Sequence, residues 1–244
     1  MAARLIEKVN LSAKGLLRKA QNIFKKVKEP PRGGQGLEKK ISISDCLMSA
    51  LAIFKLKFPS LLQFEESKIE VPIKQNLKNL FGLEKVPCDT YMRERLDEID
   101  PKDLRPAFTS VFSALQRGKE LERFAFLDGK YLLLNDGTGF FSSKKVHCDN
   151  CCEKHHKKDG SITFHHQMLG SVIAHPDYKE VIPLCPEPIM KEDGSTKNDC
   201  ERNASKRFLE RFRAYHPKLK IIMVEDALSS NAPHIRDLEK HGIK

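Results

Sequence analysis

The chain has 244 residues, enough for one large or two small domains with a buried core, and 40% of them are hydrophobic. The longest stretch without a charged side chain, residues 161–176, is shorter than the roughly 20 apolar residues of a membrane-spanning helix. Seven cysteines, three of them crowded at Cys148, Cys151 and Cys152, favour reduced thiols or a bound metal over a disulfide framework. We therefore expect a cytoplasmic protein that is neither secreted nor embedded in a membrane.

Positive charge is concentrated at the start of the chain. The whole chain carries a net charge of +10, and residues 1–40 hold eleven lysines and arginines against three glutamates. The apolar residues recur mostly at helical spacing, and a proline- and glycine-rich run follows them. These apolar residues are Leu5, Val9, Leu16, Ala20, Ile23 and Val27. We predict a basic amphipathic helix and a linker over residues 1–36.

Three roles remain open for this basic segment. It could contact phosphate groups of a nucleic acid, because each neutralised phosphate releases counterions. It could instead bind a membrane surface or act as a targeting segment. The third alternative is a solvated arm that packs its apolar side on the domain behind it.

Residues 37–118 have the pattern of a helical subdomain, which we expect to contact DNA if the chain binds it. The stretch 46–54 is apolar on nearly every side, which predicts a buried helix with Ser44 as its N-cap that ends before Pro59. Further helices are expected at residues 74–81, 89–99 and 104–117.

From residue 119 onward the pattern changes to strands. The expected strands lie within residues 123–134 and at 140–146, 167–174, 180–184 and 219–224, and the expected helices at 199–214 and 233–240. The run 135–139 reads as a turn, and the prolines at positions 183, 186 and 188 argue against further ladder pairing. This order of elements predicts an α/β fold with a mixed sheet.

Two aspartates follow apolar strands in this pattern. Asp136 comes after four strand-like residues, and Asp226 comes after the buried strand with one glutamate between them. Ligands bind at this edge of an open α/β sheet, so the two carboxylates converge if their strands are neighbours. Converging carboxylates repel unless a hard cation such as Mg²⁺ lies between them, and such a cation supports phosphodiester cleavage. The alternative is that both aspartates are ordinary turn formers.

Several segments carry a resemblance to a known family. They are residues 87–96 (PCDTYMRERL), 134–143 (LNDGTGFFSS), 198–204 (NDCERNA) and 224–235 (VEDALSSNAPHI), with a Cys/His block between the second and third. Together they resemble DDE-type transposases of bacterial insertion sequences. The resemblance covers roughly residues 40–244.

This resemblance implies a ribonuclease-H-like catalytic core over residues 119–244, in the bacterial cytoplasm. Asp136 matches the first metal-binding acid of the family and Asp226 the second. The family binds Mg²⁺ or Mn²⁺, nicks DNA at transposon ends and joins the freed 3′-hydroxyl to a new strand, and a homo-oligomer is a candidate assembly. The family's third acid, a glutamate on a later helix, has no counterpart in the 18 residues after Asp226. We therefore expect a truncated core with impaired activity.

The Cys/His block lies in an insertion at residues 147–166. Its candidate zinc ligands are Cys148, Cys151, Cys152, His155 and His156, and His165 and His166 follow close behind. The two-residue gap between Cys148 and Cys151 lets both thiolates reach one tetrahedral ion. The alternatives are a solvated insertion with free thiols and a catalytic Cys–His pair.

The sequence thus predicts a transposase-like protein, and the rival interpretation is a non-catalytic, zinc-stabilised DNA-binding protein. Four basic residues on the helix at 199–214 are candidate phosphate contacts: Lys206, Arg207, Arg211 and Arg213. His234 lies on the helix after Asp226. We expect it to be an exposed helical residue, and the alternative is that it faces the metal site between the two aspartates.

Overall fold

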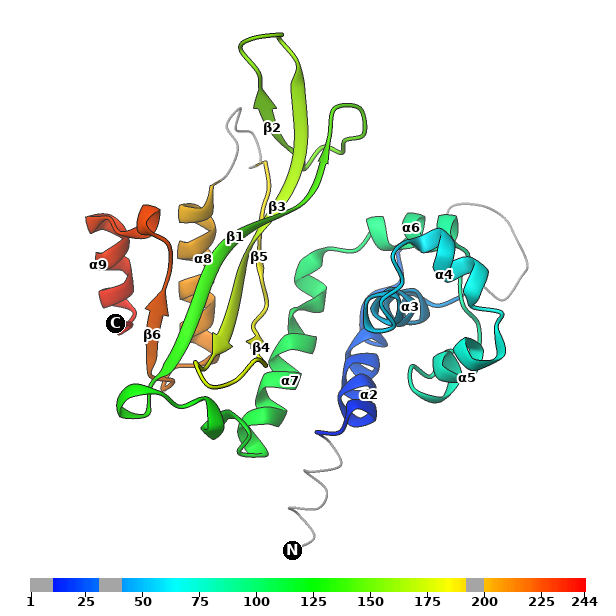
Figure 1. The fold of residues 1–244 in the computed structure, drawn as a ribbon, viewed down its shortest axis with the longest axis horizontal. Coiled ribbons are helices and arrows are strands. Elements are labelled where there is room, and N and C mark those ends of the chain that lie inside the picture. The colour runs from blue at the N-terminus through cyan, green and yellow to red at the C-terminus, as the bar shows by residue number, and fades with distance from the viewer. Residues whose placement is uncertain (1–10, 31–40, 192–199) are drawn as a thin grey trace, which may run out of the picture. The chain divides into compact units, whose positions relative to one another are not determined.

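The computed structural model describes residues 11–30, 41–191 and 200–244 (Figure 1). Two compact units make up the chain, Met1–Gly118 and Lys119–Lys244, and the division falls where the helical subdomain was expected to end. Among the described residues, none of the helices combines the length and the apolar character that crossing a bilayer requires.

The first unit is helical. Its helices are α2 (Ala13–Phe24), α3 (Ile43–Lys55), α4 (Leu61–Ser67), α5 (Val71–Asn79), α6 (Asp89–Asp97) and α7 (Arg105–Arg117). Phe24 and Val27 are buried in the same cluster as Cys46 and Met48 of α3, so the described part of the basic segment packs on the domain behind it. Leu5 and Val9, and residues 31–36 of the expected linker, lie outside the described residues.

Two helix starts in this unit differ from the prediction. Helix α3 begins after Ser42, whose hydroxyl accepts a hydrogen bond from the Asp45 amide at 3.1 Å, and Ser44 is instead buried inside the helix. Helix α4 was not predicted, yet Ser60 caps it by accepting from the Gln63 amide at 3.1 Å. Capping serines therefore start both helices, because the first amides of a helix have no partner within it.

The second unit is a mixed α/β structure. Its strands are β1 (Tyr131–Ser143), β2 (Cys152–His155), β3 (Ile162–Ala174), β4 (Ile182–Pro183), β5 (Glu187–Ile189) and β6 (Ile221–Val224). The order is β2-β3-β1-β6, and β4 and β5 also pair with β3. Strands β1 and β6 are parallel and the other pairs are antiparallel. Helix α8 (Glu201–Tyr215) packs against β3 and β5, and α9 (Ala232–Lys240) follows β6 (Figure 1).

The predicted turn at residues 135–139 was wrong. Strand β1 runs without a break from Tyr131 to Ser143, and only a register shift between Gly139 and Phe141 disturbs its pairing with β3. Asp136 lies opposite Gly170 in this ladder. Asparagine, aspartate and glycine favour turns locally, but continuous pairing with a neighbouring strand outweighs that preference.

Pairing along β3 also differs from the prediction. Strand β5 contains Pro188, which lies opposite Met168, although the prolines were expected to prevent pairing. Proline is tolerated on an edge strand, where its missing amide would face outward. Strand β2, inside the Cys/His block, was not predicted. The residues expected to begin the first strand instead form short 3₁₀ turns at Leu121–Phe124 and Leu127–Gly129.

Leu133 provides a test of this sheet, because it lies between Ile173 of β3 and Met223 of β6 and is completely buried. Replacing Leu133 with alanine leaves a cavity in the core, so we expect the free energy of unfolding to fall by about 2–5 kcal/mol in urea denaturation. Leu134→Ala is the control, because Leu134 is 37% exposed on the other face of the strand. Equal losses for the two variants would contradict this sheet arrangement.

Candidate functional site

The parallel pairing of β1 and β6 determines where the two predicted aspartates lie. The last paired residues are Leu134 and Val224, and Asp136 and Asp226 each come two positions later. Both aspartates line one cleft of about 440 Å³ at this edge of the sheet. The structure therefore brings together two acids that are ninety positions apart in the sequence.

A buried polar network lies directly behind the two aspartates. Asn135 donates a hydrogen bond from its amide nitrogen Nδ2 to Oε1 of Glu225 at 2.8 Å, which joins the residues that precede Asp136 and Asp226. Ser171 of β3 donates to Oδ1 of Asn135 at 2.6 Å, and His234 of α9 is hydrogen-bonded to Oε2 of Glu225 at 2.5 Å. The network thus connects β3, β1, the end of β6 and α9.

His234 belongs to this network and is only 8% exposed. The expectation of an exposed helical histidine was therefore wrong. Asn231 caps α9 by accepting a hydrogen bond from the His234 amide at 3.2 Å, and this cap directs the first turn of the helix toward the cleft. An asparagine cap followed by proline in the sequence indicates where this helix begins. The sequence does not show that His234 is hydrogen-bonded to Glu225.

Local hydrogen bonds orient both carboxylates. Oδ1 of Asp136 accepts from the Gly137 amide at 2.8 Å. Oδ1 of Asp226 accepts from the Ser229 amide at 3.3 Å and from the Ser229 hydroxyl at 3.4 Å. The Asp136 bond forms within β1 and the Asp226 bonds form with the turn after β6, so each carboxylate is held at the cleft.

The first turn of α8 forms another wall of the cleft and contributes a further acid, Glu201. Its carboxyl group lies over Gly137, where a β-carbon would collide with it. Ser205, one turn further along α8, is buried with no hydrogen-bond partner for its hydroxyl among the described residues. Sequence reasoning used residues 198–204 only for the resemblance and did not single out Glu201, because nothing local shows that α8 faces β1.

The donor set of the cleft consists of carboxylate oxygens. Asp136, Asp226 and Glu201 all line it, and the neighbouring side chains Ser229 and Asn231 also carry oxygen atoms. Hard cations such as Mg²⁺ prefer oxygen ligands and are bound through one or two carboxylates plus substrate phosphates. In the described part of the chain these carboxylates do not form a group of three ligand atoms within 4.8 Å of one another, so a magnesium or manganese ion in the cleft stays a prediction.

The Cys/His block forms a second group of potential ligands. Sγ of Cys148 lies 3.8 Å from Sγ of Cys151, and Nε2 of His166 lies 3.2 Å and 3.3 Å from these two sulfur atoms. Within the described residues these three side chains form the group that could hold a metal ion. His166 was noted in the sequence only as lying close behind the block, because its approach depends on the pairing of β3 with β1.

The other three predicted zinc ligands have different partners. Cys152 is buried, and its thiol contacts the Ile189 carbonyl oxygen at 3.7 Å. His155 lies 3.2 Å from Oε2 of Glu153, and His156 lies 2.8 Å from the Thr163 hydroxyl. The structure therefore does not bring Cys152, His155 and His156 to the Cys148–Cys151 pair.

Burial affects the protonation of the Cys/His group. Desolvation raises the pKa of the Cys151 thiol above its ordinary value. Desolvation also lowers the pKa of His166, and the neighbouring His165 adds to this effect. At neutral pH the His166 ring is therefore neutral and can offer a lone pair.

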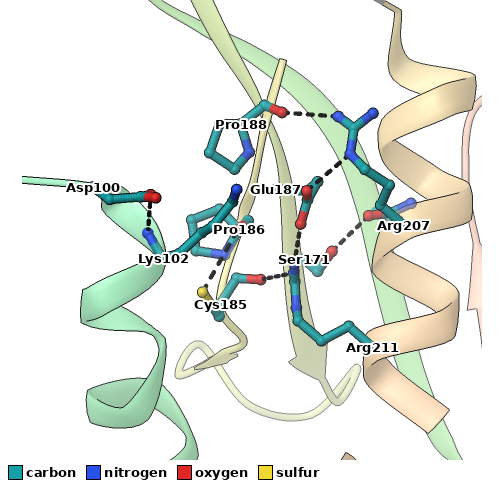
Figure 2. A network of polar contacts seen from close by, with 10 residues as sticks. Asp100, Lys102, Ser171, Cys185, Pro186, Glu187, Pro188, Arg207 and Arg211 are labelled. Carbon is teal, nitrogen blue, oxygen red and sulfur yellow. Dashed lines mark hydrogen bonds and ion pairs between the residues drawn. The ribbon is translucent and has the colours of Figure 1, made fainter. Parts of the chain in front are cut away.

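Two of the predicted phosphate contacts, Arg207 and Arg211, belong to an ion-pair network inside the protein (Figure 2). Both are paired with the carboxylate of Glu187, whose side chain is 6% exposed. Arg207 also donates to the Pro188 carbonyl at 3.1 Å, and Arg211 donates to the Cys185 carbonyl at 3.1 Å. This network fastens α8 to β5 and the loop before it.

The other two candidates also have partners within the chain. Arg213 donates to the carbonyl oxygens of Leu219 at 2.7 Å and His216 at 3.2 Å. Lys206 lies 4.0 Å from Asp237, and its side chain is 59% exposed. A structural role is therefore evident for the three arginines, and contact of these four residues with a nucleic acid stays a prediction.

No protein-family model, curated protein or solved structure matches this chain. The transposase resemblance therefore rests on the sequence segments quoted above.

The Asn135–Glu225 bond can be tested with the isosteric substitution Asn135→Asp. It places two carboxylates face to face in a buried position, so we expect the free energy of unfolding to fall by about 3 kcal/mol at pH 8. The loss should shrink toward pH 5, because repulsion raises the pKa of one of the pair and the folded state takes up a proton. Urea denaturation at both pH values measures this. Asn203→Asp, at an exposed position of α8, should show neither effect.

The network in Figure 2 predicts that Glu187→Ala is strongly destabilising. It leaves two arginines beside a buried position without their carboxylate, which costs about 3–5 kcal/mol of unfolding free energy. The matched control is Glu120→Ala, which removes the surface pair with Arg123 and should cost at most about 1 kcal/mol. Similar losses from the two variants in thermal or urea denaturation would show that the Glu187 pairs are not structural.

Proposed function

We propose that this protein is DDE-transposase-like: its intact relatives cleave DNA phosphodiester bonds and transfer the freed strand with the help of Mg²⁺ or Mn²⁺, and this chain carries the same kind of cleft with impaired activity. The observation that carries the proposal is the convergence of Asp136 and Asp226 on one cleft from two adjacent parallel strands. Each residue corresponds to a metal-binding acid of the family that the sequence resembles.

The strand arrangement supports this proposal. The acid-bearing strand β1 lies between an antiparallel neighbour, β3, and a parallel neighbour, β6, and the second acid follows the parallel neighbour. A ribonuclease-H-like core, which the resemblance implies, places its first two acids on neighbouring strands in this way. The cleft also has the size of typical ligand sites, which enclose about 300–1,000 Å³.

In this proposal each residue of the cleft has a definite task. Asp136 and Asp226 would hold the metal ion, which when bound activates a water or 3′-hydroxyl nucleophile and stabilises the leaving oxygen. Asn135, Glu225 and His234 hold β1 and the end of β6 in register and thereby position the aspartates. The Ser205 hydroxyl lines the cleft and offers a hydrogen bond to a ligand.

Charge supports a polyanionic substrate. The net charge of +10 attracts DNA over long range and strengthens binding as salt is lowered. Four acids line the cleft, Asp136, Glu201, Glu225 and Asp226, against one arginine, Arg202, so the cleft by itself repels a phosphate and a bridging cation would offset that repulsion. The same argument explains why the proposed activity depends on a divalent metal.

A nicking assay on supercoiled plasmid with Mg²⁺ or Mn²⁺ tests the proposal. We expect Asp136→Asn and Asp226→Asn each to lower the rate about 1,000-fold, because a metal contributes several kcal/mol and about 1.4 kcal/mol corresponds to a factor of ten. Asp128→Asn is the control, since this exposed loop carboxylate pairs only locally with Lys130 at 2.8 Å. Mn²⁺ binding, followed by electron paramagnetic resonance, should weaken in the same two variants.

Two results would contradict the proposal. One is nicking that persists in both aspartate variants, since the activity would then arise elsewhere. The other is salt-sensitive DNA binding without any cleavage in either metal, which would favour the non-catalytic DNA-binding protein.

A further inference from the structure

Residues 140–166 form a projection of the second unit that we call the outer ribbon. Strand β1 has no β6 partner beyond Leu134, but it stays paired with β3 as far as Ser143 and Phe164. Strand β2 pairs with the same part of β3 from the other side. Figure 1 shows this ribbon extending away from β6 and α8. The ribbon has three strands but few buried side chains, so an additional contact that joins its strands would stabilise it.

The Cys148–Cys151 turn lies in the connection between β1 and β2. The Cys151 amide donates to the Cys148 carbonyl at 3.1 Å, and the Cys148 amide points to the Cys151 sulfur at 3.4 Å. His166 extends from β3 to the same two sulfur atoms, and its ring stacks on Phe140 with centroids 5.9 Å apart. The turn and the strand therefore meet through these three side chains.

We propose that Cys148, Cys151 and His166 bind one zinc ion, which fastens the connection between β1 and β2 to β3 and orders the outer ribbon. The site is distinct from the aspartate cleft, and the proposal does not rest on the proposed function. Its ligands come from the block that the sequence marked for zinc, but in a combination that only the strand pairing reveals.

The distances fit one face of a zinc tetrahedron. With Zn–S near 2.3 Å and Zn–N near 2.0 Å, two sulfur ligands lie about 3.8 Å apart, and a sulfur and a nitrogen lie about 3.5 Å apart. The corresponding distances here are 3.8 Å between the sulfurs and 3.2 Å and 3.3 Å from the sulfurs to the imidazole nitrogen. A disulfide would need the two sulfurs to approach to about 2.04 Å.

The donor types select the metal. Two thiolates and an imidazole favour zinc over the hard cation of the aspartate cleft. In the described part of the chain, no fourth His, Cys, Asp or Glu joins the group within 4.8 Å. Because Cys148 is exposed, we assign the fourth position to a water molecule. Metal binding then contributes folding free energy to a ribbon that has few buried side chains.

Zinc content of the purified full-length chain tests this assignment. We expect about one zinc per chain after dialysis, and at least about 100-fold weaker zinc binding in Cys148→Ser, Cys151→Ser and His166→Ala, since even losing an outer-shell partner costs 10- to 100-fold. Cobalt substitution should produce a thiolate-to-cobalt charge-transfer band that the two cysteine variants weaken. The cobalt spectrum of the unmodified chain tests the site even if a variant fails to fold.

Matched controls exclude a general effect of removing a thiol or an imidazole. Cys88→Ser removes an exposed thiol, and His155→Ala removes a ring of the same ribbon that faces Glu153, so both should keep the zinc. Asp136→Asn should also keep it, which separates this site from the proposed active site. A zinc-selective chelator should speed tryptic cleavage at the lysines of the ribbon, which are Lys144, Lys145, Lys154, Lys157 and Lys158.

Three outcomes would overturn the proposal. The first is reduced protein that takes up neither zinc nor cobalt with thiolate character. The second is equal loss of zinc in the control variants and the ligand variants. The third is a Cys148–Cys151 disulfide in protein purified with reductant and zinc.

Discussion

The parallel pairing of β1 with β6 is the constraint on which the candidate active site depends. It brings together residues separated by most of the second unit and places Asp136 and Asp226 in step, two positions beyond the last paired residues. The Asn135–Glu225 hydrogen bond continues this register past the end of the ladder. A shift of one residue between the two strands would place the two acids on opposite faces of the sheet, because side chains alternate along a strand.

The polar groups behind the aspartates stabilise this register together, because each one is a hydrogen-bond partner of the next. Ser171, Asn135, Glu225 and His234 each bond to the next, and a buried polar group without a partner costs about 1–3 kcal/mol. A displaced strand would therefore lose several bonds together. Helix α8 completes the cleft and is itself held by the pairs of Arg207 and Arg211 with Glu187. The arginines that seemed suited to DNA thus support the walls of the site.

Strands β1 and β3 carry two centres of different chemistry at different points along their length. Near Asp136 the neighbouring side chains offer hard oxygen atoms, whereas at the outer ribbon they offer two sulfurs and an imidazole. The same ladder positions both, since Asp136 lies opposite Gly170 and His166 lies opposite Phe141. Because the donor sets prefer different metals, the two proposed metal sites can be tested independently.

The sequence by itself determined the elements whose signals are local. These include helices α2, α3, α5, α6 and α7 of the first unit, a strand at residues 221–224, the mixed α/β class and the choice of the two aspartates as candidate site residues. The strand at 221–224 was expected to be fully buried, but Val224 is 44% exposed, and Asp136 lies within β1 rather than at its end. It misplaced the run 135–139, because its turn-forming residues are held extended by pairing with β3. It also missed the contacts of Glu201, His166 and His234. Only the tertiary structure decided these three contacts, because each joins segments that are distant in the chain. A hydrogen bond or burial between distant segments produces no periodic pattern in the sequence of either segment.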